Sequence, residues 1–249
     1  MTERIVVSPG DLLGDGVFET LHLRPSGPWL LEEHLARLVR SSSILEMPEP
    51  PVDRIRSAIS DLSVSSGALR VIYTRSGVLN VSVSEIPATV LRERREGVRV
   101  LTADLGFSVR KPPPWSLSAA KSLSYASNFA ARRWAARHRA DDVVWLSTEG
   151  YVLEAPTASV VWLDGGVLCT VPSEEAGILP GITADHLLSV AGAAGLGAAR
   201  RMLTASELAG AEAIWLTSSL RGLAEVIELD GEARDRSPWT PRLLDLLGF

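Results

Sequence analysis

The chain has 249 residues and contains very little cysteine, histidine or lysine. Its single cysteine, Cys169, excludes an internal disulfide, and the apolar residues around it favour a buried strand over a reactive thiol. The four histidines show no metal-ligand spacing, so we expect no metal site. A net charge of −5 offers no basic surface for nucleic acid, and no apolar run is long enough to span a membrane. These absences predict a cytoplasmic globular protein that binds neither nucleic acid nor membrane.

Only two of the 25 basic side chains are lysines, Lys111 and Lys121. Coding composition explains most of this bias toward arginine, but arginine cannot replace lysine where a neutral amine must attack a carbonyl. A lysine amine that is desolvated beside other cations can lose its proton and form a Schiff base. Lys121, in Lys-Ser-Leu-Ser-Tyr-Ala-Ser-Asn at the start of a helix-like segment, is therefore the first catalytic candidate. Lys111 lies in a proline-rich stretch and is expected to be exposed.

Hydrophobic periodicity in the first half of the chain indicates strands with helices between them. Strands are predicted at 4–8, 17–23, 69–74, 78–83 and 97–102, and helices at 31–45 and 52–62. This order favours an α+β sheet covered on one face.

Three consecutive prolines at 112–114 interrupt the pattern and predict a stiff linker at 109–117. The linker would separate an N-terminal α+β domain, 1–108, from a C-terminal α/β domain, 118–249. In the second domain we predict helices at about 118–138, 183–194 and 241–247, and strands at 142–147, 159–163, 167–171, 201–203, 213–216 and 224–227.

Glu154 follows the apolar residues Tyr-Val-Leu and stands just before Ala-Pro. A carboxylate at the end of a hydrophobic strand needs a partner, because an unpaired charge there is unfavourable. The protonated ring nitrogen of a ligand and a surface arginine would each serve as that partner.

Two segments have the composition of anion sites. Gly177-Ile-Leu-Pro-Gly-Ile-Thr183 brings the backbone round tightly and opens a helix, whose first N–H groups suit a phosphate. An ordinary helix with Thr183 as its N-cap is the alternative. Thr217-Ser218-Ser219, followed by Arg221, places hydroxyls and a cation at a strand end, although a plain polar turn is as frequent.

Two arginines of the first half are further candidates for binding an anion. Arg37 lies at the edge of an apolar stripe, where a half-buried guanidinium needs an anionic partner. Arg75 ends a predicted strand. Taken singly, such arginines are more often solvated surface residues.

Five motifs together resemble one family. Gly14-Asp-Gly-Val-Phe-Glu-Thr20, His34-Leu-Ala-Arg-Leu, Lys121 with Tyr125, Tyr151-Val-Leu-Glu and Gly177-Ile-Leu-Pro-Gly-Ile-Thr183 occur in the order found in class IV aminotransferases. These are the fold-type IV pyridoxal-phosphate enzymes, and this chain looks most like the actinobacterial aminodeoxychorismate lyases.

The resemblance implies two domains, the larger C-terminal one with a barrel-like sheet, and a homodimer whose subunits complete each other's active sites. Lys121 would hold pyridoxal 5'-phosphate as a Schiff base, near Tyr125, and Glu154 would pair with the ring nitrogen. The family implies that Arg37, Ile182, Thr183 and Ser219 hold the phosphate, and that Ser218 also belongs to the cofactor-binding residues. Phe18, Arg75 and Arg221 are the candidates for contacting the substrate.

The implied reaction is that of a 4-amino-4-deoxychorismate lyase, which gives 4-aminobenzoate and pyruvate for folate biosynthesis. A D-amino-acid or branched-chain amino-acid transaminase is the alternative, because both activities use the same cofactor and lysine. A non-catalytic binding domain on the same fold is a third hypothesis. Intact Lys121, Glu154 and Arg37 argue against it.

Overall fold

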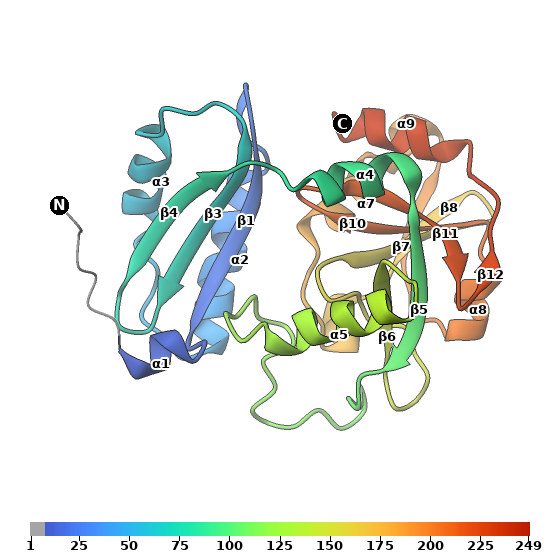
Figure 1. Cartoon of the computed structure of the whole chain (residues 1–249), viewed down its shortest axis with the longest axis horizontal. Coiled ribbons are helices and arrows are strands. Elements are labelled where there is room, and N and C mark those ends of the chain that lie inside the picture. The colour runs from blue at the N-terminus through green and yellow to red at the C-terminus, as the bar shows by residue number, and fades with distance from the viewer. Residues whose placement is uncertain (1–7) are drawn as a thin grey trace. The chain divides into compact units, whose positions relative to one another are not determined.

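The computed structural model describes residues 8–249, which form two compact units (Figure 1). The first unit combines the chain up to Ile86 with Leu117–Ala126, and the second combines Pro87–Ser116 with Ser127–Phe249. The strand predicted at 4–8 lies outside the described residues, except for Ser8, which caps helix α1. Within the described part of the chain, every helix is too short or too polar to cross a membrane.

The described residues of the first unit form a four-stranded antiparallel sheet in the order β2-β1-β3-β4. Its elements are α1 (Pro9–Leu12), β1 (Gly16–Arg24), β2 (Gly27–Pro28), α2 (Leu31–Ile44), α3 (Val52–Ser60), β3 (Gly67–Thr74) and β4 (Leu79–Ser84). Alternate residues of β1 are buried, as the period of a strand requires. The apolar stripes of α2 and α3 share one core cluster with β1 and β3, so both helices cover the same face. The predicted strands at 17–23, 69–74 and 78–83 and the helices at 31–45 and 52–62 are confirmed.

The described residues of the second unit form a curled mixed sheet of eight strands, in the order β6-β5-β11-β10-β7-β8-β9, with β12 beside β11 (Figure 1). The strands are β5 (Val98–Asp104), β6 (Asp142–Leu146), β7 (Ser159–Asp164), β8 (Val167–Thr170), β9 (Gly197–Arg200), β10 (Ala213–Ser218), β11 (Gly222–Leu229) and β12 (Glu232–Ala233). The helices are α4 (Ala88–Glu96), α5 (Ala126–Arg137), α6 (Ser173–Ala176), α7 (Ile182–Val190), the short 3₁₀ turn η1 (Ala191–Ala194), α8 (Ala205–Ala209) and α9 (Trp239–Leu246). Helices α4 and α9 pack on β11, and α7 packs on β10.

The two units divide the chain differently from the predicted boundary at 109–117. Strand β5 belongs to the second unit, because it pairs in parallel with both β11 and β6. Residues 117–126 return to the first unit, where Ser122 forms an antiparallel bridge with Val17 of β1. The prolines therefore mark a connection inside the second unit and not a simple boundary.

Three local predictions also need correction. The helix predicted at 118–138 begins only at Ala126, because residues 121–123 pair with β1. The strand predicted at 201–203 lies earlier, as β9, where Gly197–Arg200 pairs with β8. Helix α4 was not predicted, since its sequence Ala-Thr-Val-Leu-Arg-Glu-Arg-Arg-Glu has no sustained apolar stripe.

Candidate functional site

In the first unit, the backbone of Lys121 is fixed to strand β1 and to helix α2. The N–H of Phe18 donates to the Lys121 carbonyl at 3.0 Å, and the N–H of Leu123 donates to the Gly16 carbonyl at 2.8 Å. The N–H of Lys121 donates to Ser41 Oγ of α2 at 3.1 Å. A Cβ at Gly16 would lie 2.7 Å from Leu123 Cδ1 and 2.8 Å from the backbone carbonyl oxygen of Tyr73, which cannot move aside, so glycine is required here. The lysine thus stands on a strand-like segment with a defined position.

The amine of Lys121 lies against two aromatic side chains. Lys121 Nζ is 4.6 Å from the centre of the Phe18 ring and 3.5 Å from the hydroxyl of Tyr125. The two rings meet edge to face, with their centroids 5.0 Å apart. The structure therefore brings Phe18, Lys121 and Tyr125 together as a group, with the lysine half-buried. Apolar ring faces limit the hydration of the amine, while the hydroxyl gives it a hydrogen-bond partner.

Next to Phe18 in β1, Glu19 binds both Arg37 and His34 of helix α2. Arg37 donates from Nε to Glu19 Oε1 at 2.7 Å and from Nη2 to Oε2 at 2.8 Å. His34 Nδ1 lies 2.7 Å from Glu19 Oε2. Burial alone would raise the pKa of Glu19, but the charge and hydrogen bonds of Arg37, aided by His34, outweigh it and hold that pKa far below its usual range. Glu19 is therefore ionised, and the anionic partner expected for Arg37 is this carboxylate.

His34 is held neutral in this cluster. Burial lowers the pKa of His34, and the charges of Arg37 and Lys121 lower it further, against the opposing effect of Glu19. An ionised carboxylate only accepts hydrogen bonds, so the Nδ1 atom of His34 carries the proton that faces Glu19. The ring thereby fixes one carboxylate oxygen without adding a charge.

Arg75 lies elsewhere in the first unit, at the end of β3. Its Nε donates to Asp15 at 2.6 Å, and its two Nη atoms donate to the carbonyls of Leu45 and Glu46 at 2.7 and 2.9 Å. These contacts tie the end of β3 to the end of α2. The predicted contact of Arg75 with a substrate remains a prediction.

In the second unit, Glu154 follows two fully buried residues, Val152 and Leu153. The N–H of Leu153 donates to the carbonyl of Trp145 at 2.8 Å, and the N–H of Trp145 donates to the carbonyl of Glu154 at 2.9 Å. These two bonds hold the Glu154 backbone beside β6. Glu154 is half-buried at the end of this pairing.

The N-terminus of α7 has no side-chain cap. Its N-cap is Gly181, so the alternative that Thr183 caps this helix is wrong. Thr183 is 3% exposed, and its Oγ1 atom has no hydrogen-bond partner among the described residues. A Cβ at Gly181 would lie 2.0 Å from Ser159 Oγ, so the start of the helix packs directly on the start of β7. Uncapped N–H groups beside a buried unpaired hydroxyl suit an anion.

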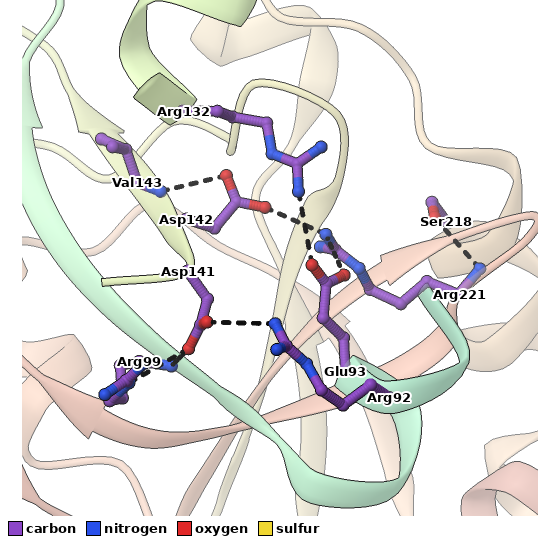
Figure 2. Close-up of polar contacts among 9 residues, drawn as sticks. All are labelled: Arg92, Glu93, Arg99, Arg132, Asp141, Asp142, Val143, Ser218 and Arg221. Atoms are coloured by element: carbon purple, nitrogen blue, oxygen red, sulfur yellow. Dashed lines mark hydrogen bonds and ion pairs between the residues drawn. The ribbon is translucent and has the colours of Figure 1, made fainter. Parts of the chain in front are cut away.

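The turn between β10 and β11 carries the hydroxyls of Ser218 and Ser219. Ser218 Oγ accepts a hydrogen bond from the N–H of Arg221 at 3.3 Å, and Ser219 is buried. Arg221 Nη2 lies 2.9 Å from Glu93 Oε2 and 3.0 Å from Asp142 Oδ2 (Figure 2). With 3% of its side chain exposed and two carboxylate partners from the chain, Arg221 gives no support for the predicted contact with a substrate.

The structure thus arranges the predicted site residues in two sets, one in each unit. Phe18, Arg37, Lys121 and Tyr125 lie in the first, and Glu154, Ile182, Thr183, Ser218 and Ser219 lie in the second. Sequence reasoning missed Glu19 and Glu93. A signal for Glu19 was available, because it shares the buried face of β1 with Val17 and Leu21, where a carboxylate needs a cationic partner.

The chain is similar to known proteins over most of its length. The chain matches the family described as amino-transferase class IV over residues 16–229. A bifunctional aminodeoxychorismate lyase / D-amino acid transaminase of Mycobacterium tuberculosis is 39% identical over 246 residues, which cover 90% of this chain and 85% of that protein.

Two solved structures show the same fold. A hypothetical aminotransferase from Mycobacterium tuberculosis, in its PLP-bound form, has a TM-score of 0.91 at 38% identity, covering 100% of this chain and 93% of that one. A fold IV transaminase from Curtobacterium pusillum has a TM-score of 0.85 at 36% identity, covering 100% of this chain and 89% of that one. The predictions of a fold-type IV architecture and of a pyridoxal-phosphate enzyme are confirmed. The chain therefore belongs to the class IV aminotransferase family.

Proposed function

We propose that this protein is a pyridoxal-phosphate-dependent 4-amino-4-deoxychorismate lyase, which releases 4-aminobenzoate and pyruvate. The observation that carries the proposal is the placement of Lys121, whose amine lies 3.5 Å from the Tyr125 hydroxyl on a segment fixed to β1. Two motifs, Lys121-Ser-Leu-Ser-Tyr-Ala-Ser-Asn and Tyr151-Val-Leu-Glu-Ala-Pro-Thr, resemble the lyases and favour this reaction.

The residues present fit the cofactor. Pyridoxal phosphate needs an amine for its aldehyde, a carboxylate for its ring nitrogen and donors for its phosphate. Lys121 and Glu154 supply the first two. The buried, unpartnered Oγ1 atom of Thr183, beside the uncapped start of α7, gains an acceptor when a phosphate binds there. Ile182, Ser218 and Ser219, with Arg37, complete the proposed set of phosphate donors.

The proposed reaction gives each of the residues Lys121, Tyr125 and Glu154 a defined task. Bound pyridoxal phosphate supplies a ring that withdraws electrons from the carbon bearing the substrate amine. Lys121 Nζ would hold the cofactor through its aldehyde carbon and, once the substrate amine takes its place, would be free to remove the proton from the carbon that bears that amine. The hydroxyl of Tyr125 orients Nζ, and Glu154 keeps the ring nitrogen protonated. The bond between the substrate ring and the enolpyruvyl oxygen would then break, and the released enolpyruvate would take up a proton on its methylene carbon to become pyruvate. The substrate ring becomes aromatic, so the reaction needs no added keto acid.

D-amino-acid transamination is the second candidate on the same site. The relative from Mycobacterium tuberculosis carries both activities in its name and is similar over 90% of this chain. Both reactions begin with removal of a proton by the lysine, so the residues of the first unit serve either one.

The two activities are separated by supplying chorismate, an aminating enzyme and glutamine, with no keto acid present. Release of 4-aminobenzoate and pyruvate in equal amounts is expected, and it should be abolished in Lys121→Ala but retained in Lys111→Arg. Transfer of the amino group from D-alanine to 2-oxoglutarate, with no 4-aminobenzoate formed, would overturn the lyase in favour of the transaminase.

A homodimer is part of the proposal. Two leucines at the end of helix α1 are exposed: Leu12, its last residue, is 75% accessible, and the following Leu13 is 82% accessible. A partner subunit would remove such apolar side chains from water. Light scattering over a dilution series tests this point, and a monomer that is fully active when dilute would contradict it.

A further inference from the structure

The geometry points to helix α4 as the element that positions the phosphate-binding turn between β10 and β11. Glu93 and Arg94 of α4 contact this turn, residues 218–222, and act as positioning residues for Ser218 and Ser219. The inference rests on the proposed function, in which those two serines bind the cofactor phosphate.

The side chain of Arg94 binds the backbone of the turn. Its Nε donates to the carbonyl of Arg221 at 3.0 Å, and its Nη2 donates to the carbonyl of Leu220 at 2.5 Å. The same guanidinium lies over the ring of Phe249, 4.4 Å from its centre. Gly222, at φ +63°, approaches this ring so closely that a Cβ would lie 3.0 Å from it. Arg94 thus fixes the carbonyls of Leu220 and Arg221, and the ring of Phe249 packs against the following Gly222.

Glu93 fixes the turn through the side chain of Arg221. Glu93 is 3% exposed and pairs with Arg221 at 2.9 Å and with Arg132 of α5 at 3.3 Å. Asp142 of β6 is the second carboxylate on Arg221 (Figure 2). Burial alone would lower the pKa of Arg221, but Asp142 and Glu93 outweigh it and raise that pKa. Two cations and two carboxylates balance in this buried cluster, which we call the α4 cluster.

The α4 cluster is connected to Ser218 through Arg221, because the cluster holds the Arg221 side chain and the N–H of Arg221 donates to Ser218 Oγ. Ser219 lies between that bond and the Leu220 carbonyl held by Arg94. Its position is therefore set before any ligand arrives. A binding loop ordered in advance loses less conformational entropy when it binds its ligand, so its affinity is higher.

An exposed group near the α4 cluster provides a matched control. Arg92 and Arg99 both pair with Asp141, at 3.7 and 3.2 Å (Figure 2). This group includes a residue of α4 and the neighbour of Asp142, but within residues 8–249 its ion pairs and hydrogen bonds do not reach residues 218–222. Asp141→Asn consequently changes the charge beside the cluster without touching the turn.

The test compares the dissociation constants of pyridoxal phosphate and of pyridoxal, which lacks the phosphate, for the full-length protein after cofactor removal. In Arg94→Gln we expect the affinity for pyridoxal phosphate to fall about tenfold or more, as for loss of a charged hydrogen bond, with the affinity for pyridoxal unchanged. Arg94→Lys, which keeps the charge without the two-nitrogen fork, should lose less, and Glu93→Gln should show the same selective loss. Asp141→Asn should leave both constants unchanged.

Ser219→Ala separates failure of this inference from failure of the proposed function. The role of α4 would be overturned if Ser219→Ala selectively lost affinity for pyridoxal phosphate while Arg94→Gln and Glu93→Gln did not. In that case the two α4 variants would either lose no affinity or lose as much affinity for pyridoxal as for pyridoxal phosphate. No selective loss in Ser219→Ala itself would overturn the assignment of the phosphate to this turn.

Discussion

The two units each contain a buried charge cluster, and the two are built differently. In the first, Glu19 of β1 binds Arg37 and His34, which lie one turn apart on a single helix. In the second, Glu93, Arg132, Asp142 and Arg221 come from two helices, a strand and a turn, and the separation from Glu93 to Arg221 exceeds 120 residues. The first cluster depends on one carboxylate, whereas the second shares two. The first therefore orients a side chain, and the second orients a segment of backbone.

The largest effect is expected for Arg221→Met. Methionine leaves Glu93 and Asp142 buried with only Arg132 nearby, so we expect the free energy of unfolding to fall by about 3–5 kcal/mol. Urea unfolding measures this loss. Arg99→Met, in the exposed group, should lose only a small fraction of it, and similar losses in both variants would show that burial of the second cluster has no energetic consequence.

A smaller effect is expected for Glu19→Gln, because Arg37 retains some access to water while Glu93 and Asp142 have almost none. Loss of the ionised acceptor should lower the free energy of unfolding by about 1.5–3 kcal/mol. The guanidinium of Arg37 also loses its fixed orientation, so pyridoxal phosphate should bind more weakly than in the wild type. Unchanged cofactor binding would separate Arg37 from the phosphate.

The contribution of the Glu19 cluster to the free energy of unfolding should depend on pH. The pKa of Glu19 is lowered in the folded state, so its contribution is present above the ordinary value of 4.5 and is lost as the pH falls below it. The pKa of His34 is also lowered, so the unfolded chain gains a proton below pH 6.5 that the folded chain refuses. The stability difference between wild type and Glu19→Gln should therefore hold above pH 4.5 and shrink as the pH falls below that value. A constant difference, measured by urea unfolding at each pH, would contradict this.

The smallest effect is expected for Glu32→Gln. Glu32 pairs with Arg56 through two nitrogens, as Glu19 does with Arg37, but both Glu32 and Arg56 are open to solvent. Exposed pairs of this kind contribute little, so the urea midpoint should stay unchanged. A loss as large as that of Glu19→Gln would mean that bidentate geometry, and not burial, sets the strength of these pairs.

The contrast between the clusters also explains how far the sequence could be interpreted. Periodicity was enough for β1 and α2, and the motifs pointed to Lys121 and Glu154 because local chemistry there is distinctive. Glu93 could not be found in the same way. Its helix is a run of charged residues without an apolar stripe, and its partners are distant in sequence. Residues 121–123 were predicted to be helical, but they pair with β1 instead. A local sequence pattern gives no information about such pairing with a distant strand.

The pairing of residues 121–123 with β1 has a consequence for how the protein is made. The backbone groups of Gly16 and Phe18 that accept this segment lie on the edge of β1 opposite β3, and they are among the earliest parts of the sheet to leave the ribosome. Their partners are synthesised about a hundred residues later, several seconds afterwards at ordinary elongation rates. Until then the nascent sheet carries an open edge, which is a template for pairing with other chains. A fragment ending at Ile86 would keep that edge permanently, so the return of the lysine segment also protects the sheet against aggregation.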